Sequence, residues 1–242
     1  CIELSHQAAV VHPLAPKPEG RAAFGRYVLQ HYTPSRQKYG FHFKSYDERV
    51  FTPVIRHEIR NAQPTDQGHY TVYLPGYHDD VLMHFLRQFD VRWEVFSKYA
   101  HYAYRVDNVF IEPISQQRFQ QSLISATGVL CGAGFELPSE ALFLGKNTMV
   151  IPMKGHYEQT CNALGAADVG ATTIPELDLL YHRQINYWLE KTEQAPVLFK
   201  DQTEQLLVDI LSAFQREGRA AYEPTVEFET LKQKLGLLRY FF

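Results

Sequence analysis

The segment from Val129 to Ala171 alternates between apolar runs of strand length and longer runs with helical spacing. An apolar strand over Gly128–Cys131 ends at a glycine turn, and a helix is predicted to begin near Leu137. A second strand, a polar loop, a second helix and a third strand follow. Alternation at this interval indicates a parallel sheet with helices on both faces. This segment therefore predicts an α/β fold of the Rossmann-like class.

The same alternation extends toward the N-terminus. Three further strands are predicted at His69–Leu74, Arg92–Phe96 and Asn108–Ile111, with helices at Asp79–Phe89 and Ser115–Ser125. Ligands of such sheets bind beyond the carboxyl ends of the strands. Polar and glycine-containing loops follow several of these strand ends, so we expect one site to form there.

The flanking segments have a different character. Before the α/β region we predict strands at Cys1–His6 and Tyr39–Phe43, and a helix at Arg21–Tyr32 with apolar residues at helical spacing. After Gly170 the periodicity is helical only. The predicted C-terminal helices cover Pro175–Trp188, Gln202–Arg216 and Thr225–Tyr240.

Composition excludes several classes of protein. The formal net charge of −3 gives no general attraction to nucleic acid or to anionic membranes. The sequence contains no run of 18 apolar residues, which is the length expected of a membrane-spanning helix. The 3 cysteines and 11 histidines follow no metal-ligand spacing, so we expect no metal and predict that Cys131 and Cys161 are reduced core residues. A cytoplasmic protein is the simplest interpretation.

A set of motifs in the central segment supports a more specific comparison. They are Gly134, Ser139-Glu140, Gly145-Lys146, Met149–Pro152 and Glu158–Ala163. In this order they resemble the donor-binding, C-terminal half of GT-B glycosyltransferases. The resemblance is greatest to the branch that contains the N-acetylglucosaminyltransferase of peptidoglycan synthesis and related uncharacterised glycosyltransferases.

This resemblance implies a domain organisation. Residues 1–48 would be the remnant of an N-terminal acceptor domain with the interdomain segment. Residues 49–172 would form the Rossmann-like nucleotide-sugar-binding domain, and residues 173–242 a helical extension whose last helices return to the N-terminal part. We expect the missing N-terminal domain, or a partner subunit, to contact the acceptor, which would be a glycan or a lipid-linked molecule. Peripheral attachment to the inner membrane face is then an open alternative.

The resemblance also implies a set of donor contacts. A helix start favours an anion, so the backbone of Gly134, Phe135 and Glu136 would meet the diphosphate. Glu140 would accept hydrogen bonds from the ribose, and Ile114 would face the base. The complete predicted donor-binding set is Arg56, Gly76, Tyr77, Lys98, Ile114, Gly134, Phe135, Glu136, Ser139, Glu140, His156, Glu158, Gln159 and Asn162.

Structural explanations compete with these roles. The glycines also permit a tight turn, Glu140 also suits a helix start, and Arg56 also suits a surface ion pair. The loop at Gly76-Tyr77 has fewer glycines than the family's phosphate loop. No Asp-x-Asp sequence occurs, as expected for transfer without a metal cofactor.

The predicted function is the transfer of a sugar from a UDP-type donor to an unknown acceptor. No catalytic residue is assigned, because the base of such enzymes comes from early loops of the N-terminal domain. We therefore expect this chain alone to have little activity. Two alternatives stay open, which are a non-catalytic or partner-dependent donor-binding subunit and an enzyme like the UDP-sugar 2-epimerases. The epimerase alternative is disfavoured, because such enzymes have a Ser-Gly-Gly phosphate loop and Gly132–Glu136 contains no double glycine.

Overall fold

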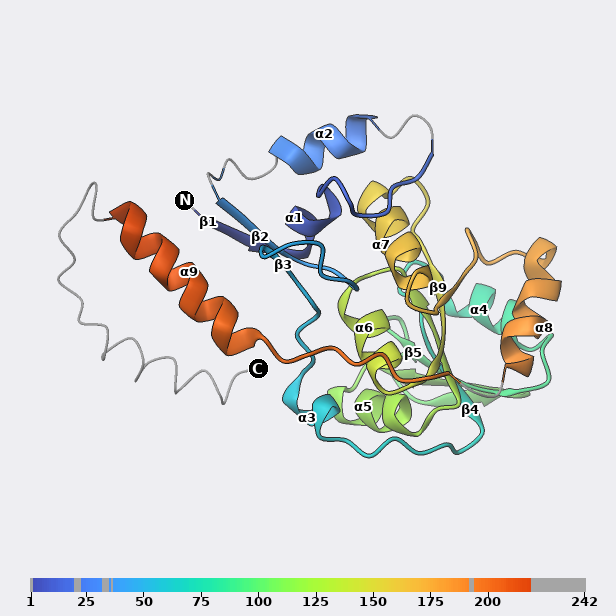
Figure 1. Cartoon of the computed structure of the whole chain (residues 1–242). Coiled ribbons are helices and arrows are strands. Elements are labelled where there is room, and N and C mark those ends of the chain that lie inside the picture. Colours follow the sequence, from blue (N-terminus) through green and yellow to red (C-terminus); the bar gives the residue numbers. More distant parts are fainter. Residues whose placement is uncertain (1, 20–22, 32–34, 36, 192–193, 219–242) are drawn as a thin grey trace.

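The computed structural model describes residues 2–19, 23–31, 35, 37–191 and 194–218. Within these residues the backbone forms a three-stranded sheet and a seven-stranded sheet (Figure 1). The small sheet is parallel and contains β1 (Ile2–Ser5), β2 (Gln37–Phe41) and β3 (Val50–Phe51). The large sheet contains β4 (His69–Tyr73), β5 (Arg92–Ser97), β6 (Tyr104–Val106), β7 (Val109–Pro113), β8 (Gly128–Gly132), β9 (Asn147–Ile151) and β10 (Thr172–Thr173).

The large sheet has the strand order β10-β9-β8-β4-β5-β7-β6, and all its pairs are parallel except β6 with β7. One face is covered by α4 (Asp79–Leu86) and α8 (His182–Glu190). The other is covered by α5 (Gln116–Ser125), α6 (Glu136–Phe143) and α7 (Tyr157–Ala167). The predicted Rossmann-like sheet with helices on both faces is therefore confirmed.

The strand residues divide between the two faces with the expected period of two. In β8, Val129 and Cys131 contact the helices α5 to α7, whereas Leu130 belongs to the core under α4 and α8. All three side chains are buried, as is typical of a parallel strand covered on both sides. Continuous apolar runs are therefore the sequence signature of this sheet.

The first C-terminal helix begins later than predicted. Residues 175–178 are not helical, and a short 3-10 turn over Leu179–Tyr181 precedes α8. Asp178 caps this turn by accepting a hydrogen bond from the Leu180 amide. Trp188 of α8 is fully buried and its ring lies 5.0 Å from that of Tyr70. Residues predicted to form an extension thus contribute to the core of the large sheet.

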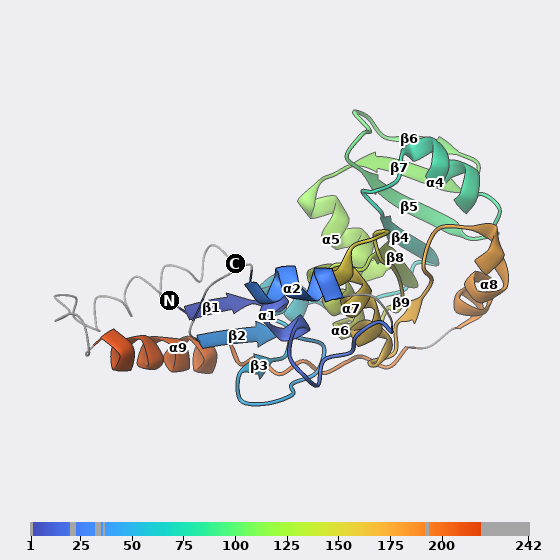
Figure 2. The ribbon, with the colours of Figure 1, turned by 90° about the horizontal axis from the view of Figure 1, so that it is seen from above.

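The segment before β4 and the last described helix form a second layer. The small sheet carries α1 (His6–Val10) and α2 (Ala23–His31), and the short α3 (His57–Arg60) leads to the large sheet. The helix α9 (Thr203–Gly218) returns to the small sheet, where Leu206 packs with Tyr39 and Phe51 (Figure 2). This matches the expected return of the C-terminal helices, whereas the helix predicted at 225–240 lies outside the described residues. The predicted domain boundaries stay predictions.

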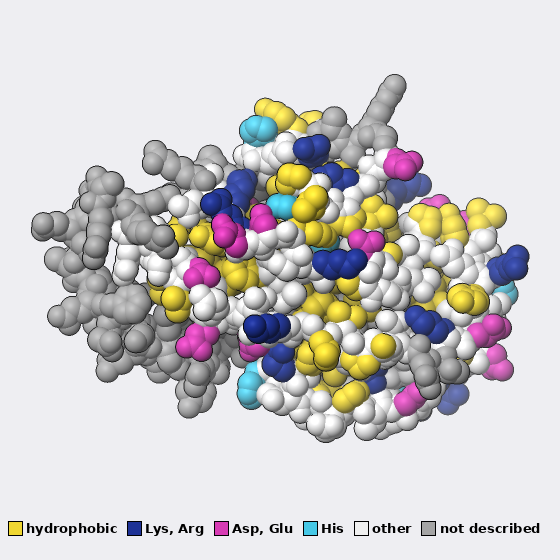
Figure 3. Space-filling model, viewed as in Figure 1, with side chains coloured by type: hydrophobic (Ala, Val, Ile, Leu, Met, Phe, Trp, Pro, Cys, Tyr) yellow, Lys and Arg dark blue, Asp and Glu magenta, His cyan; other side chains and the backbone are white. Residues whose placement is uncertain are grey.

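The apolar residues of α2, whose helical spacing suggested a buried face, lie on the solvent side of the helix. Phe24, Tyr27 and Val28 are exposed, and Figure 3 shows apolar side chains over this helix. Gly25 and Leu29 are partly buried on this helix, and Gly25 lies directly against Tyr157 on α7. A Cβ at Gly25 would overlap Tyr157, so the glycine permits the close approach of the two helices. Among the described residues no helix has the length and apolar character of a membrane span.

The two layers meet along α7 and the loop after β8. Phe43, which follows β2, packs edge-on against Phe135 with 5.1 Å between ring centroids. Gly165 of α7 lies against the ring of the buried His42. In both Figure 1 and Figure 2, α1 and α2 lie beside α7. The small sheet therefore lies next to the carboxyl edge of β8.

Replacing Gly165 tests this contact. A Cβ at this position would overlap the His42 ring, so we expect Gly165→Ala to lower the free energy of unfolding by about 1–3 kcal/mol. This loss would occur although alanine favours a helix over glycine by about 1 kcal/mol. Gly76→Ala is the control, because no atom lies within 4 Å of its added Cβ. Urea unfolding of both variants provides the measurement, and a stabilised Gly165→Ala would contradict the packing.

His42 predicts a pH dependence of stability. Burial lowers the pKa of His42 to about 4, while its Nδ1 hydrogen-bonds the Tyr46 hydroxyl at 2.9 Å. The unfolded chain binds this proton below about pH 6.5, but the folded chain does not until about pH 4. Stability is thus complete above pH 6.5 and falls as the pH decreases toward 4. We expect His42→Asn to reduce this slope by up to about 1.4 kcal/mol per pH unit in unfolding titrations. An unchanged slope would contradict it.

Candidate functional site

The direction of chain growth reverses at the centre of the large sheet. From β4 the chain adds β5 and β7 on one side, and it then returns to add β8, β9 and β10 on the other. The loops after β4 and β8 therefore leave the sheet in opposite directions. A crevice between such loops is the usual ligand site of an open parallel sheet.

The loop after β8 leads directly into α6. The Ala133 amide donates to Ile151 O at 2.9 Å, and Phe135 is the N-cap residue without a side-chain cap. A Cβ at Gly134 would meet no atom within 4 Å. The space beside Gly134 is thus open, and the amides at the uncapped start of α6 favour an anion. It begins at Glu136, one residue before the position predicted.

Two predicted residues lie behind this loop. Ser139 is buried and donates to Phe135 O at 2.7 Å. Asn162 is also buried, with its Nδ2 3.4 Å from Ala133 O and its Oδ1 without a hydrogen-bond partner. Both side chains fix the backbone of the turn in the structure, and direct donor contacts of these residues stay predictions.

Arg56 and Glu140 form a bidentate ion pair. Arg56 Nε and Nη2 each donate to a Glu140 carboxylate oxygen at 2.6 Å. Glu140 is 3% exposed, whereas 38% of the Arg56 side chain is exposed. The hydrogen bonds that Arg56 donates to Glu140 raise the pKa of Arg56. The sequence assigned these residues to different parts of a donor, and the structure joins them.

The loop between β9 and α7 folds back on itself. His156 Nδ1 accepts from the Gln159 amide at 3.3 Å, and Gln159 Oε1 accepts from the Met153 amide at 2.8 Å. Glu158 points instead to the small sheet, where His6 lies 2.6 Å away. His6 was not included in the predicted site. A Ser-His-Gln sequence directly after an apolar strand is the signal that marks it.

The remaining predicted residues follow β4, β5 and β7. Gly76 is exposed, while the Tyr77 hydroxyl accepts from the Leu177 amide at 3.2 Å and thereby contacts the α8 side of the sheet. Lys98 lies 4.9 Å above the ring of Tyr99, which stacks on His78 at 4.4 Å. Ile114 is 49% exposed. These residues lie at the edge of the sheet, and none of the hydrogen bonds or ion pairs among the described residues joins them to the Arg56–Glu140 pair.

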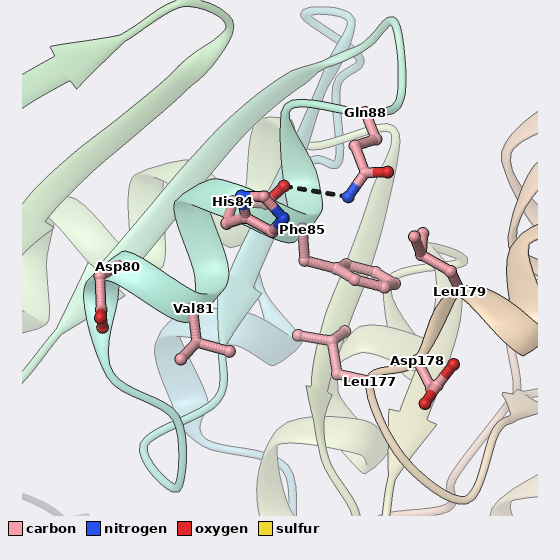
Figure 4. A pocket seen from close by; sticks show the side chains of 8 residues that line it. All are labelled: Asp80, Val81, His84, Phe85, Gln88, Leu177, Asp178 and Leu179. Atoms are coloured by element: carbon pink, nitrogen blue, oxygen red, sulfur yellow. Dashed lines mark hydrogen bonds between the residues drawn. The ribbon is translucent and has the colours of Figure 1, made fainter.

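An open pocket lies elsewhere on the large sheet. It is formed by α4 and the segment before α8 (Figure 4). Its lining residues are Asp80, Val81, His84, Phe85, Gln88, Leu177, Asp178 and Leu179. The predicted donor residues are not among them. In the described part of the chain no cluster of three His, Cys, Asp or Glu residues could hold a metal ion.

Comparison with known proteins identifies the family. The profile of a family described as glycosyl transferase family 1 matches residues 10–192. The chain belongs to this family. The glycosyltransferase resemblance of the sequence is therefore confirmed. A search of curated proteins found no match.

Three solved glycosyltransferases resemble the fold. The kitacinnamycin glycotransferase has 16% identity and a TM-score of 0.43, with 72% of this chain and 46% of that one covered. Acinetobacter baumannii MurG has 18% identity and a TM-score of 0.48, with 87% of this chain and 66% of that one covered. The spinosyn forosaminyltransferase SpnP has 10% identity and a TM-score of 0.44, with 91% of this chain and 64% of that one covered. This chain thus spans between 46% and 66% of their lengths.

A double-mutant cycle tests the Arg56–Glu140 pair. Arg56→Met leaves a buried carboxylate without its partner, so we expect the free energy of unfolding to fall by about 2 kcal/mol. The double variant with Glu140→Met should lose less than the sum of the single variants, with a coupling of about 1–3 kcal/mol. Arg118–Glu112 is the matched control, because it is also bidentate but its carboxylate side chain is 19% exposed, against 4% for Glu140. Its coupling should stay below about 1 kcal/mol, and equal couplings would contradict our account of burial.

Proposed function

We propose that this chain is the donor-binding part of a glycosyltransferase that transfers a sugar from a UDP-type nucleotide sugar to an acceptor. The observation that carries the proposal is the open start of α6 at the point where the strand order reverses. Family membership supports sugar transfer in general. The choice of uridine rests on the resemblance of the sequence motifs.

The diphosphate would lie against the backbone of Gly134, Phe135 and Glu136. An uncapped helix start offers amide donors and partial positive charge there. The guanidinium of Arg56 would also contact the diphosphate. Its side chain is partly exposed and has N–H donors besides the two that hydrogen-bond Glu140. Glu140 would reach the ribose when Arg56 moves toward the phosphates.

The bound donor would then follow the edge of the sheet. Ile114 after β7 would contact the base, and the β9–α7 loop, on the opposite side of the crevice, would contact the sugar. Helix amides and basic side chains would stabilise the charge of the leaving diphosphate without a metal. A base from another domain or a partner subunit would activate the acceptor, so this chain alone would transfer little sugar. A lipid-linked acceptor would bring the protein to the membrane face.

Calorimetric titration with UDP and ADP tests the proposal. We expect preferential binding of UDP, with Kd between roughly micromolar and millimolar. Glu140→Gln should weaken it about tenfold, because the amide removes a charged acceptor from the ribose. Glu58→Gln, an exposed carboxylate at the start of α3, is the control and should bind UDP like the wild type.

A second variant separates binding from folding. Gly134→Val places its side chain in open space beyond the turn, so the protein should fold but bind no UDP. Unimpaired UDP binding by Gly134→Val would overturn the position of the diphosphate. Absence of UDP binding by the folded wild type would overturn the proposed function.

A further inference from the structure

The carboxylate of Glu158 is held by two side chains of the small sheet's first helix. His6 Nε2 lies 2.6 Å from Glu158 Oε1, and Gln7 Nε2 donates to Oε2 at 3.1 Å. The imidazole also stacks on Phe135, with ring centroids 5.5 Å apart and planes within 8°. His6 therefore contacts both Glu158, which is 152 positions away in the sequence, and Phe135 in the loop at the start of α6.

The orientation of His6 is set by local structure. Ser5 ends β1 and caps α1, because its Oγ accepts from the Ala8 amide at 3.1 Å. The same hydroxyl donates to Glu3 at 2.9 Å. His6 therefore begins the helix in a fixed position with its side chain at the boundary of the two sheets. About a third of that side chain, 36%, is exposed, so the cluster is reached by solvent.

The hydrogen bonds around Glu158 leave unused acceptor capacity. A carboxylate has about four lone-pair sites, and each oxygen of Glu158 accepts one bond from the pair His6 and Gln7. The hydrogen bond from His6 lowers the pKa of Glu158, so the group is ionised at neutral pH. Two acceptor sites remain on the carboxylate, 13% of whose side chain is exposed, and they are enough for two hydroxyl groups of a hexose.

We propose that His6 and Gln7 are positioning residues that orient Glu158 toward two adjacent hydroxyl groups of the donor sugar. The inference rests on the proposed function and assigns part of the sugar subsite to the small sheet. Glu158 lies at the start of α7, beyond the α6 start that would hold the diphosphate. The sugar would extend from the diphosphate along Phe135 to this carboxylate.

A second histidine provides a matched control. His12 pairs with Asp47 at 3.1 Å and stacks on Tyr46 at 5.5 Å with planes within 6°. Its contacts repeat those of His6, but they lie within the segment before β3 and include no residue of the donor loops. His12→Ala thus removes an equivalent set of contacts away from the crevice.

The experiment compares UDP with UDP-glucose, UDP-galactose and UDP-N-acetylglucosamine by calorimetry. We expect one UDP-hexose to bind the wild type more tightly than UDP. His6→Ala and Gln7→Ala should lower that advantage, by roughly tenfold for His6→Ala, with UDP affinity unchanged within about twofold. His6→Gln should restore much of it because its amide can donate to Glu158. His12→Ala should match the wild type, and melting temperatures establish that each variant is folded.

The outcomes separate the two proposals. If UDP binds but no UDP-hexose binds more tightly, the sugar subsite is wrong and the donor-binding function stands. The positioning role is also overturned if folded His6→Ala keeps the full advantage or loses UDP affinity equally. If the folded wild type binds none of these nucleotides, the proposed function and this inference both fail.

Discussion

The parallel pairing of β8 with β4 determines where the loops of the candidate site can lie. Tyr70 aligns with Gly128 in this pair, and a Cβ on Gly128 would come within 2.7 Å of the Tyr70 ring. The glycine therefore leaves room for the Tyr70 ring over the neighbouring strand. Tyr70 also donates to Leu189 O at 3.1 Å, so the pairing is tied to α8. The reversal of strand order at the candidate site is a consequence of this pairing.

Side chains from the segment before β4 complete the candidate site at the edge of the large sheet. Glu140 and Glu158 are the two carboxylates that the sequence predicts for donor contacts, and both are held by residues that precede β4. Arg56 holds the first, and His6 with Gln7 holds the second. An ionised carboxylate of low exposure needs such partners, since burial without them is costly. The helices of the large sheet therefore supply the two carboxylates of the predicted site, and the segment before β4 supplies their hydrogen-bond partners.

This arrangement has a consequence for donor binding. Under the proposed function, the phosphates of the donor would compete with Glu140 for the guanidinium of Arg56, and the sugar hydroxyls would donate to Glu158. Each carboxylate would then meet a different chemical group of the donor. The packing of Phe43 against Phe135 keeps the two layers close enough for both pairs to form.

The sequence by itself determined the α/β class, five strands of the large sheet between His69 and Ile151 and the turn at Gly134, but it did not predict the antiparallel strand β6. These follow from local patterns, since apolar runs and glycine turns restrict the backbone over a few residues. The tertiary structure decided the contacts between distant segments, namely Arg56 with Glu140 and His6 with Glu158. It also decided that the apolar stripe of α2 faces solvent and that Trp188 is buried under the large sheet. Periodicity shows that a helix has two faces, but the partner of each face depends on packing between segments far apart in the chain.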